Sequence, residues 1–236
     1  MIDHNTLKPC TDLLIEFEAK KLNISGEKLT FIGTKGKDVY NITKPFEDDG
    51  ELIIAGRVES RDSEESEVNF FREIDGNWVK VEKNVKLELQ DPFVTKISGE
   101  LVLGGVETYP NLALEGSLGY RTIFYRGKDV NDLKRFSAGP EFMKDIRLLE
   151  LSPNKILVFN RPQGAIGGRG KIAFTIINSL DKLNAQVISN AELLTTQFIA
   201  AEWGGSNELH LLNNGLIGVL GHVSCFDKIM DKHYYA

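Results

Sequence analysis

The stretch Gly50-Glu-Leu-Ile-Ile-Ala-Gly-Arg-Val-Glu59 decides the fold, because nearly the same phrase returns as Gly99-Glu-Leu-Val-Leu-Gly-Gly-Val-Glu107. The glycines that open the two phrases are 49 residues apart (99 − 50 = 49). Two other runs have the same form, Asn154-Lys-Ile-Leu-Val-Phe-Asn160 and Asn214-Gly-Leu-Ile-Gly-Val-Leu-Gly-His222. Each begins at a turn residue and continues as an apolar run, which is the pattern of a buried β-strand.

A polar cluster with one acidic residue precedes each apolar strand. The acids are Asp38, Asp91, Asp145 and Glu208, at intervals of 53, 54 and 63 residues. Repeats of roughly 40–50 residues with several strands each are typical of a β-propeller, in which the innermost strand of every blade lines a shared axis. Equivalent residues of the blades would then converge, so we predict an acidic mouth at one end of a central channel.

The segments between these repeats also have strand patterns. Val68–Arg72 and Trp78–Val81 alternate around the turn Asp75-Gly76-Asn77, which indicates a hairpin. Further strands are expected over residues 120–125 and 171–177, and short helical turns over residues 130–135 and 191–194. We find no long amphipathic helix and no domain linker, so we expect one all-β domain that covers residues 1–236.

Four copies of the repeat leave one blade of a five-bladed β-propeller to be explained. It would be completed by strands near Leu29–Ile32, or by sequence beyond Ala236. In the second case the last blade is incomplete and the chain is truncated at its C-terminus. The alternative fold is a pair of stacked sheets, a β-sandwich, in which the repeats arise by chance.

Composition and charge narrow the class of protein. The chain of 236 residues is 42% hydrophobic, which is enough for a buried core. Its net charge of −6, without a basic stripe, argues against nucleic acid as a partner. No apolar run approaches the roughly 20 residues of a membrane span, and residues 1–9 lack the apolar core of a secretion signal. We therefore predict a cytoplasmic protein that does not contact membranes.

Cysteine and histidine usage gives no framework for a disulfide or a metal. Cys10 and Cys225 are the two cysteines and lie far apart, which fits a reducing compartment and predicts neither a disulfide nor a zinc site. The four histidines, at positions 4, 210, 222 and 233, have no ligand spacing, so we predict no metal site and no cofactor. A single cation among the acids of the channel stays open as an alternative.

Several polar phrases resemble those of the five-bladed propellers among glycoside hydrolases and phosphorylases, as in families 43, 32 and 130. The chain most resembles the domain-of-unknown-function family 1861, which is similar to family 130, the mannoside phosphorylases and hydrolases. The matching phrases are Gly36–Phe46, Arg57–Ser63, Gln90–Lys96, Met143–Arg147 with Asn160–Gly164, and Gly221–Val223. They span residues 36–223, and the resemblance implies a five-bladed β-propeller.

The resemblance also implies roles for three residues. Asp91 sits where family 130 has the catalytic acid of its Asp-Pro phrase, so it is expected to be the proton donor. Arg161 and His222 sit where the phosphorylases hold phosphate. Gln90 and Phe93 depart from the usual family phrase Glu-Asp-Pro-Arg, so a charge expected at the sugar site is missing.

The chemistry of glycosidic bond cleavage gives the candidates their roles. The reaction needs a proton for the leaving oxygen and a nucleophile at the anomeric carbon. Asp91 is the candidate acid, and burial or neighbouring acids would raise the pKa of its carboxyl. If water is the nucleophile, a second carboxylate must act as base, and Glu208 is the candidate. If phosphate attacks, an arginine and a histidine such as Arg161 and His222 form its cradle.

Further polar residues near the strand ends are expected to hold the sugar. They are Asp38, Asn41, Arg57, Glu59 and Asp145. The alternative for the acids is a structural role in a turn or a solvated loop. The alternative for His222 is a buried histidine in the core whose hydrogen bonds are satisfied. Trp203-Gly204-Gly205 suits an open surface on which a sugar stacks. The glycine-rich loop Gln163–Gly170, which a strand follows, is expected to be a flexible rim that carries Arg169.

These observations together predict a carbohydrate-active enzyme. It would cleave a small oligosaccharide, with mannose as the candidate sugar, by hydrolysis or by phosphorolysis with inorganic phosphate as co-substrate. The alternative is a propeller without catalysis that binds a sugar or a protein. The departures at Gln90 and Phe93, or a missing final blade, would favour that alternative.

Overall fold

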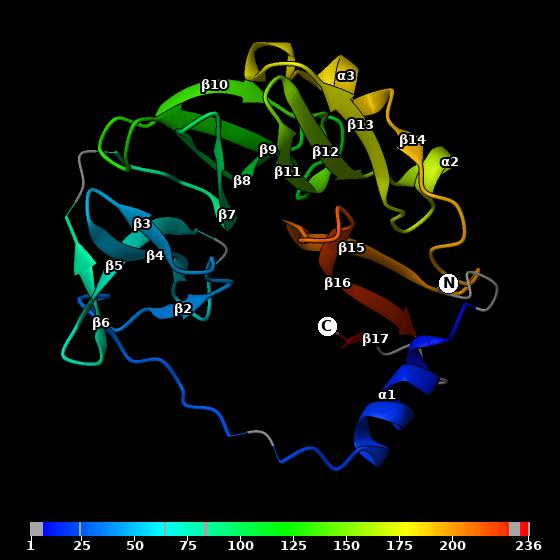
Figure 1. Ribbon diagram of the computed structural model, residues 1–236, viewed down its shortest axis with the longest axis horizontal. Helices are drawn as coiled ribbons and strands as arrows, with labels where there is room; N and C mark the ends of the chain where they lie inside the picture. Colours follow the sequence, from blue (N-terminus) through cyan, green and yellow to red (C-terminus); the bar gives the residue numbers. More distant parts are fainter. Residues whose placement is uncertain (1–6, 24, 64, 83–84, 227–231, 236) are drawn as a thin grey trace.

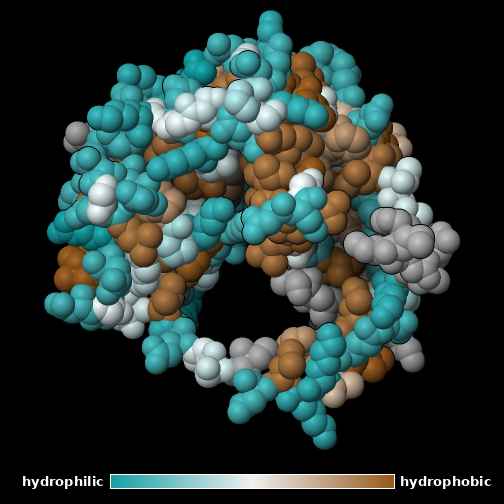
Figure 2. Space-filling view, viewed as in Figure 1, coloured by the Kyte–Doolittle hydropathy of each residue, from teal (hydrophilic) through white to brown (hydrophobic). Residues whose placement is uncertain are grey.

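The computed structural model describes residues 7–23, 25–63, 65–82, 85–226 and 232–235. Four β-sheets follow one another along this part of the chain and are arranged around a central opening (Figure 1). Helix α1 (Cys10–Ala19) and an extended segment lie along the remaining side, between the fourth sheet and the first (Figure 1). The all-β prediction is confirmed, whereas four separate sheets around an opening are incompatible with a two-sheet sandwich. Figure 2 shows the opening as a hole in the molecular surface.

The first two sheets are formed by residues 31–138. The first has the order β1-β6-β5-β4-β2, with β3 also paired to β4, and the second has the order β10-β9-β8-β7. The bounds in the first sheet are Phe31–Ile32 (β1), Asp38–Tyr40 (β2), Phe46–Asp48 (β3), Glu51–Glu59 (β4), Glu67–Ile74 (β5) and Asn77–Val81 (β6). In the second sheet they are Gln90–Ile97 (β7), Glu100–Pro110 (β8), Leu118–Gly127 (β9) and Lys134–Ala138 (β10).

The third and fourth sheets are formed by residues 144–235. Their orders are β11-β12-β13-β14 and β15-β16-β17. The strands are Lys144–Ser152 (β11), Lys155–Arg161 (β12), Ala173–Ile177 (β13), Glu192–Leu193 (β14), Trp203–Leu211 (β15), Ile217–Phe226 (β16) and Lys232–Tyr235 (β17). Three short helical elements lie in the third sheet's connections, at Gly164–Gly167 (α2), Leu180–Lys182 (η1) and Ala185–Ser189 (α3). Among the described helices, none has the length and apolar character to cross a membrane.

The repeated apolar phrases form the second strand of each sheet. They are β4, β8, β12 and β16. The strands nearest the axis are those that carry the polar clusters, since β7 and β15 both pack against β11 (Figure 1). In the first sheet β2 and β3 together take this place, because both pair with β4. The acid-bearing strands therefore line the axis, and the apolar strands support them from behind.

The core lies between adjacent sheets. One cluster joins side chains of the first and second sheets, such as Phe70 and Leu103, and another joins the second and third, such as Phe124 and Val158. Leu209 of β15 packs with Phe159 of β12 in a smaller cluster between the third and fourth sheets. Full burial of a large apolar side chain contributes roughly 1.5–3 kcal/mol, so these contacts hold each sheet against its neighbours.

The hairpin prediction is confirmed, and three other local predictions are wrong. Asp75 and Gly76 both have positive φ, 50° and 78°, which is the geometry of a tight hairpin turn between β5 and β6. Phe31–Ile32 pairs with β6 inside the first sheet, so these residues do not begin a fifth sheet. The predicted helical turns over 130–135 and 191–194 overlap the edge strands β10 and β14, since residues 134–135 and 192–193 are paired in sheets and only residues 130–131 lie in a turn. Pairing with a neighbouring strand overrides weak local propensity at both places.

The N-terminal segment brings the two cysteines together, although they lie far apart in the sequence. Cys10, at the start of α1, lies with its Sγ 3.0 Å from the Sγ of Cys225 on β16. Both thiols are buried and free. Helix α1 itself was not predicted, because its apolar residues Leu13, Ile15 and Phe17 are exposed and do not form a buried stripe.

The strands nearest the axis share a bulge close to their first residues. The pairing register shifts between Gln90 and Phe93 in β7, between Lys144 and Arg147 in β11, and between Ser206 and Glu208 in β15. Bulges re-aim side chains and are common beside active sites. The same device therefore recurs at the same end of three neighbouring sheets.

Candidate active site

A cavity of about 1000 Å³ lies at the bulged ends of these inner strands. Its acidic lining residues are Asp91, Asp145 and Glu208, and its basic ones are Lys44, Lys144, Arg147, Arg161 and Arg169. The basic side chains outnumber the acidic ones, so the prediction of an acidic mouth is wrong. The structure brings three of the four predicted acids into one cavity, and Asp38 is not among them.

The bulges explain why Asp38 is the exception. Asn41, Asp91 and Asp145 all have left-handed backbones, with φ of 43°, 49° and 56°, and Asn207 occupies the bulge of the fourth sheet. Asn and Asp tolerate this conformation better than most residues because their short side chains bond locally. The structural equivalent of Asp91 in the first sheet is therefore Asn41, three residues after Asp38.

Asp38 instead belongs to an exposed charged cluster. Its carboxylate accepts a hydrogen bond from Arg61 Nε at 2.6 Å and one from the Tyr40 hydroxyl at 3.4 Å. The Arg61 contact lowers the pKa of Asp38. Solvent screens such an exposed pair, so it contributes little to stability.

One oxygen of Asp91 is held by two described side chains. Its Oδ1 accepts hydrogen bonds from the Asn41 amide and from Arg57 Nη1, the latter at 3.2 Å. Arg57 is in turn held by Glu59, 2.7 Å from its Nη2, and by Ser66. Arg57 and Glu59 are not in the cavity lining and act on it through Asp91, while Asn41 lines the cavity directly.

Asp145 is locked into a buried ion pair. Arg161 Nη1 lies 2.6 Å from Asp145 Oδ2, and both side chains are about nine-tenths buried. Burial opposes ionisation of Asp145, but Arg147 and Arg161 outweigh it, so the pKa of the carboxyl is lowered. Gly205 makes this packing possible, because a side chain there would come within 2.6 Å of Asp145 Oδ2.

His222 extends the same cluster. Its Nδ1 is 2.7 Å from the Asn207 side-chain oxygen, and its Nε2 is 3.9 Å from Asp145 Oδ2. Burial lowers the pKa of His222, although the nearby Asp145 opposes this shift. The structure thus brings Asp145, Arg161 and His222 together, as three of the predicted site residues.

Glu208 lines the cavity from β15, with its Oε2 3.1 Å from His210 Nε2. Among the described residues, no group of three or more His, Cys, Asp or Glu side chains is arranged to hold a metal ion.

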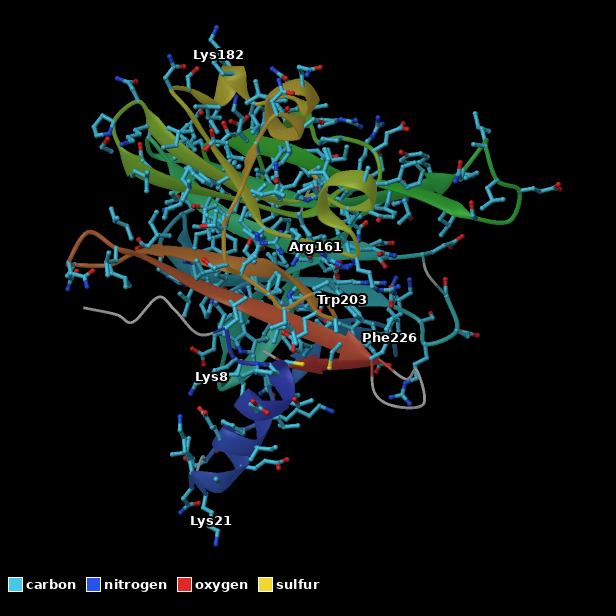
Figure 3. The ribbon with its side chains drawn as sticks, turned by 90° about the vertical axis from the view of Figure 1, so that its right-hand side faces the viewer. Lys8, Lys21, Arg161, Lys182, Trp203 and Phe226 are labelled. Carbon is cyan, nitrogen blue, oxygen red and sulfur yellow. The ribbon has the colours of Figure 1, made fainter. Side chains whose placement is uncertain are left out.

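At one side of the cavity, Arg169 packs against two aromatic rings. The Arg169 guanidinium lies 4.6 Å from the centre of the Trp203 ring and 4.5 Å from that of Phe226. Figure 3 labels Arg161 on the third sheet, with Trp203 and Phe226 below it. Trp203 is only 4% exposed, so the prediction of an open stacking surface at Trp203 is wrong. The Arg169 carbonyl also accepts hydrogen bonds from Arg161 and Gln163, which ties the glycine-rich loop to the site.

Comparison with protein families identifies the chain. Residues 15–236 match the family described as "Protein of unknown function (DUF1861)". The chain belongs to this family. The resemblance carried by the polar phrases is thereby confirmed, whereas no curated protein matches the chain.

Solved structures similar to this DUF1861 protein include carbohydrate enzymes. A mannose phosphorylase from Leishmania mexicana, in complex with a phosphate ion, is 36% identical, with a TM-score of 0.84 over 95% of this chain and 70% of that one. A GDP-Man-dependent mannosyltransferase from the same organism is 35% identical, with a TM-score of 0.83 over 96% and 72%. A β-1,2-mannobiose phosphorylase from Listeria innocua, 13% identical, has a TM-score of 0.51 over 89% of this chain and 76% of that one, and shares the fold alone.

Sequence reasoning missed Arg147 as a site residue of this DUF1861 protein. Its guanidinium lines the cavity and interacts electrostatically with Asp91, Asp145 and Glu208. Burial lowers the pKa of Arg147, and the three carboxylates oppose that shift. The sequence did contain a clue. Arg147 follows Asp145 by two residues, as Phe93 follows Asp91, so the two residues occupy equivalent positions in neighbouring repeats.

Proposed function

We propose that this protein cleaves a glycosidic bond of a small, mannose-containing sugar by phosphorolysis. The observation that carries the proposal is the cavity, where three carboxylates meet five basic side chains. A local excess of positive charge in a chain of net charge −6 favours an anionic co-substrate such as phosphate. A cavity of about 1000 Å³ is large enough for a short sugar and a phosphate ion.

The proposed mechanism uses Asp91 as the proton donor. A phosphate oxygen attacks the anomeric carbon, and the bond from that carbon to the leaving oxygen breaks with its electron pair going to oxygen. The leaving oxygen takes the proton of the Asp91 carboxyl, and the products are a sugar phosphate and the shortened sugar. Asn41 and Arg57 fix Oδ1 of Asp91, so that Oδ2 is oriented for the transfer.

Among the cations, Arg147 is better placed than Arg161 to meet phosphate. Arg161 has one nitrogen committed to Asp145 and another to the Arg169 carbonyl. Arg147 forms no direct ion pair with a described carboxylate, although Asp91, Asp145 and Glu208 act on it electrostatically, so its guanidinium retains donors for an anion. We propose that Arg147 and Lys144 bind the phosphate and that Arg161 and His222 keep Asp145 in place.

Similarity to the mannose phosphorylase, at 36% identity, supports phosphate as the nucleophile and mannose as the sugar. Mannosyl transfer from a nucleotide sugar is a second candidate, because the mannosyltransferase is almost as similar, at 35% identity. Hydrolysis would need Glu208 as the base, and one oxygen of that carboxylate contacts His210 at 3.1 Å.

We propose that the four sheets are blades of a five-bladed β-propeller. The exposure of β16 supports this proposal: residues 101–106 of β8 are all buried, whereas Ile217, Val219 and Leu220 of the equivalent strand are exposed. The place for a fifth blade is the side along which the N-terminal segment runs (Figure 1).

The test is turnover of manno-oligosaccharides with and without inorganic phosphate. The proposal expects a sugar 1-phosphate to form only when phosphate is present, and expects Glu208→Gln to retain most of this activity. Sugar release without phosphate that Glu208→Gln abolishes would indicate hydrolysis instead. Turnover only with GDP-mannose as donor would indicate transfer, and no turnover with any of these would favour a binding module.

A further inference from the structure

Among the described residues, the direct contacts of the Arg147 guanidinium are with uncharged groups. Its Nε donates to the Asn207 carbonyl at 2.6 Å, and its Nη1 donates to the Ile146 carbonyl at 3.0 Å. The third contact is the Phe93 ring, whose centre lies 4.8 Å from Arg147 Cζ. A cation above an aromatic face is attracted to it without being neutralised, unlike a cation paired with a carboxylate.

Phe93 is itself rigidly placed. It is 6% exposed and meets Phe124 edge to face, with the ring centres 6.2 Å apart. Its ring lies over Gly104, where even a Cβ atom would come within 2.1 Å of it. The bulge that positions Asp91 ends at Phe93, so the proton donor and this ring belong to one fixed unit.

We propose that Phe93 is a positioning residue that orients Arg147 toward the anionic co-substrate. Phe93 on the second sheet supports a guanidinium from the third, so the anion site spans the boundary between the two sheets. This inference rests on the proposed function, because it assumes that the cavity binds phosphate. It also gives the aromatic residue at position 93 a role: the ring carries no charge and instead directs the charge of its neighbour.

The test compares Phe93→Leu with Phe93→Tyr by calorimetric titration with inorganic phosphate and by steady-state kinetics. Loss of a desolvated cation–π contact should raise the phosphate Kd and KM roughly 3- to 30-fold in Phe93→Leu, with kcat changed less. Phe93→Tyr retains the ring and should rescue affinity. Phe70→Leu is the matched control, since Phe70 is equally buried but lies in the core between the first two sheets.

Each outcome has a distinct meaning. Unchanged phosphate affinity in a folded Phe93→Leu, or equal losses in Phe93→Leu and Phe70→Leu, would overturn the positioning role while leaving the proposed function intact. If the parent protein neither binds nor consumes phosphate, both proposals fail. Should Phe93→Leu not fold, Phe93→Tyr against Phe93→Met makes the same comparison, because the flexible Met side chain fills irregular gaps in a core.

A second inference rests on the buried thiol pair and is independent of the reaction. The Cys10 backbone N–H donates to the buried Glu202 carboxylate at 2.6 Å, which docks the start of α1 on the fourth sheet. Figure 3 shows α1, between Lys8 and Lys21, projecting from that sheet. At its other end the segment pairs with β6 through Phe31–Ile32. The N-terminal segment is therefore a strap with both ends anchored.

We infer that Cys10 and Cys225 form a redox-sensitive clasp for this strap. With a small disulfide such as oxidised glutathione, one thiolate displaces a glutathione thiol to give a mixed disulfide. The second cysteine then displaces the other glutathione, so two protein thiols become one disulfide and two glutathione thiols form. Burial and the neighbouring Cys225 and Glu202 raise the pKa of Cys10, so the exchange should be slow while α1 stays docked.

The test incubates the parent protein with oxidised glutathione and measures intact mass, free thiols and Tm. A clasp predicts a loss of about 2 Da and two thiols in the monomer, with Tm raised by roughly 10 °C because the link closes a long loop. Dithiothreitol should reverse the change, and Cys10→Ser should not show it. Stable glutathione adducts, disulfide-linked dimers or an unchanged thiol count in the parent would overturn the inference.

Discussion

Asp91 and Asp145 occupy the same bulge position in neighbouring sheets, yet their surroundings give them different tasks. Asp91 is 22% exposed at its side chain, and one of its oxygens is oriented by Asn41 and Arg57. Asp145 is buried against Arg161 and cannot approach a substrate without breaking that pair. The repeated bulge thus places an aspartate at the same position in both sheets. The neighbouring side chains determine whether that aspartate is catalytic or structural.

The comparison predicts that Asp91→Asn has the largest effect on activity and a small one on stability. Removal of a general acid typically costs 10²–10⁴-fold in rate, so kcat should fall by about that factor while Tm changes little. Steady-state kinetics with a manno-oligosaccharide and phosphate, alongside thermal unfolding, checks both parts. If Asp91→Asn lowered Tm strongly while its folded molecules kept the activity of the parent, Asp91 would have the structural role and not the catalytic one.

Asp145→Asn should show the opposite balance, with stability affected most. Removing one member of a buried ion pair leaves the other charge uncompensated and costs roughly 3 kcal/mol or more. For a chain of this length that corresponds to a fall in Tm of roughly 10 °C, measurable by calorimetry. An unchanged Tm would mean that Arg161 is satisfied without Asp145.

His222, which lies beside Asp145, makes the stability of the protein depend on pH. Burial lowers the pKa of His222 from the ordinary value of 6.5. Between the lowered pKa and 6.5, His222 is therefore protonated in the unfolded chain but neutral in the folded protein. The parent should therefore lose stability as the pH falls from about 7 toward the lowered pKa of the folded state. His222→Gln should show a shallower loss over that range in urea unfolding. Parallel pH curves for the two proteins would contradict a neutral, buried His222.

Asp38→Asn is the matched control with the smallest expected effect. It makes the same chemical change as Asp91→Asn, but at an exposed ion pair outside the cavity. Activity and Tm should both stay close to those of the parent. A large loss of activity would show that the acid spacing, and not the bulge, identifies the working position in the first sheet.

Most of the fold could be predicted from the sequence, because the apolar strands recur at nearly equal intervals. The regular spacing of the acids also led to one wrong site residue, Asp38. Spacing along the sequence does not show that the residue equivalent to Asp91 in the first sheet is Asn41. The positive charge of the cavity was not predicted either, because Lys44, Arg147 and Arg169 follow no repeated pattern in the sequence and come together only in the assembled ring of sheets.

Two further features depend on contacts that no local pattern indicates. The thiol pair joins positions 10 and 225, and its formation requires a helix to dock on the last sheet. The Phe93–Arg147 contact crosses from one sheet to the next, although each residue alone has the pattern of an ordinary strand position. Such contacts follow from the assembled sheets, and sequence spacing within one repeat does not encode them.

The most direct test of Asp91 as proton donor is the dependence of its loss on the leaving group. An oligosaccharide leaving group needs a proton, whereas 2,4-dinitrophenolate departs without one. In phosphorolysis, Asp91→Asn should therefore lose roughly 10³-fold in kcat/KM on a manno-oligosaccharide but less than about 10-fold on the dinitrophenyl mannoside. Equal losses on both substrates would show that Asp91 holds the sugar and does not donate the proton.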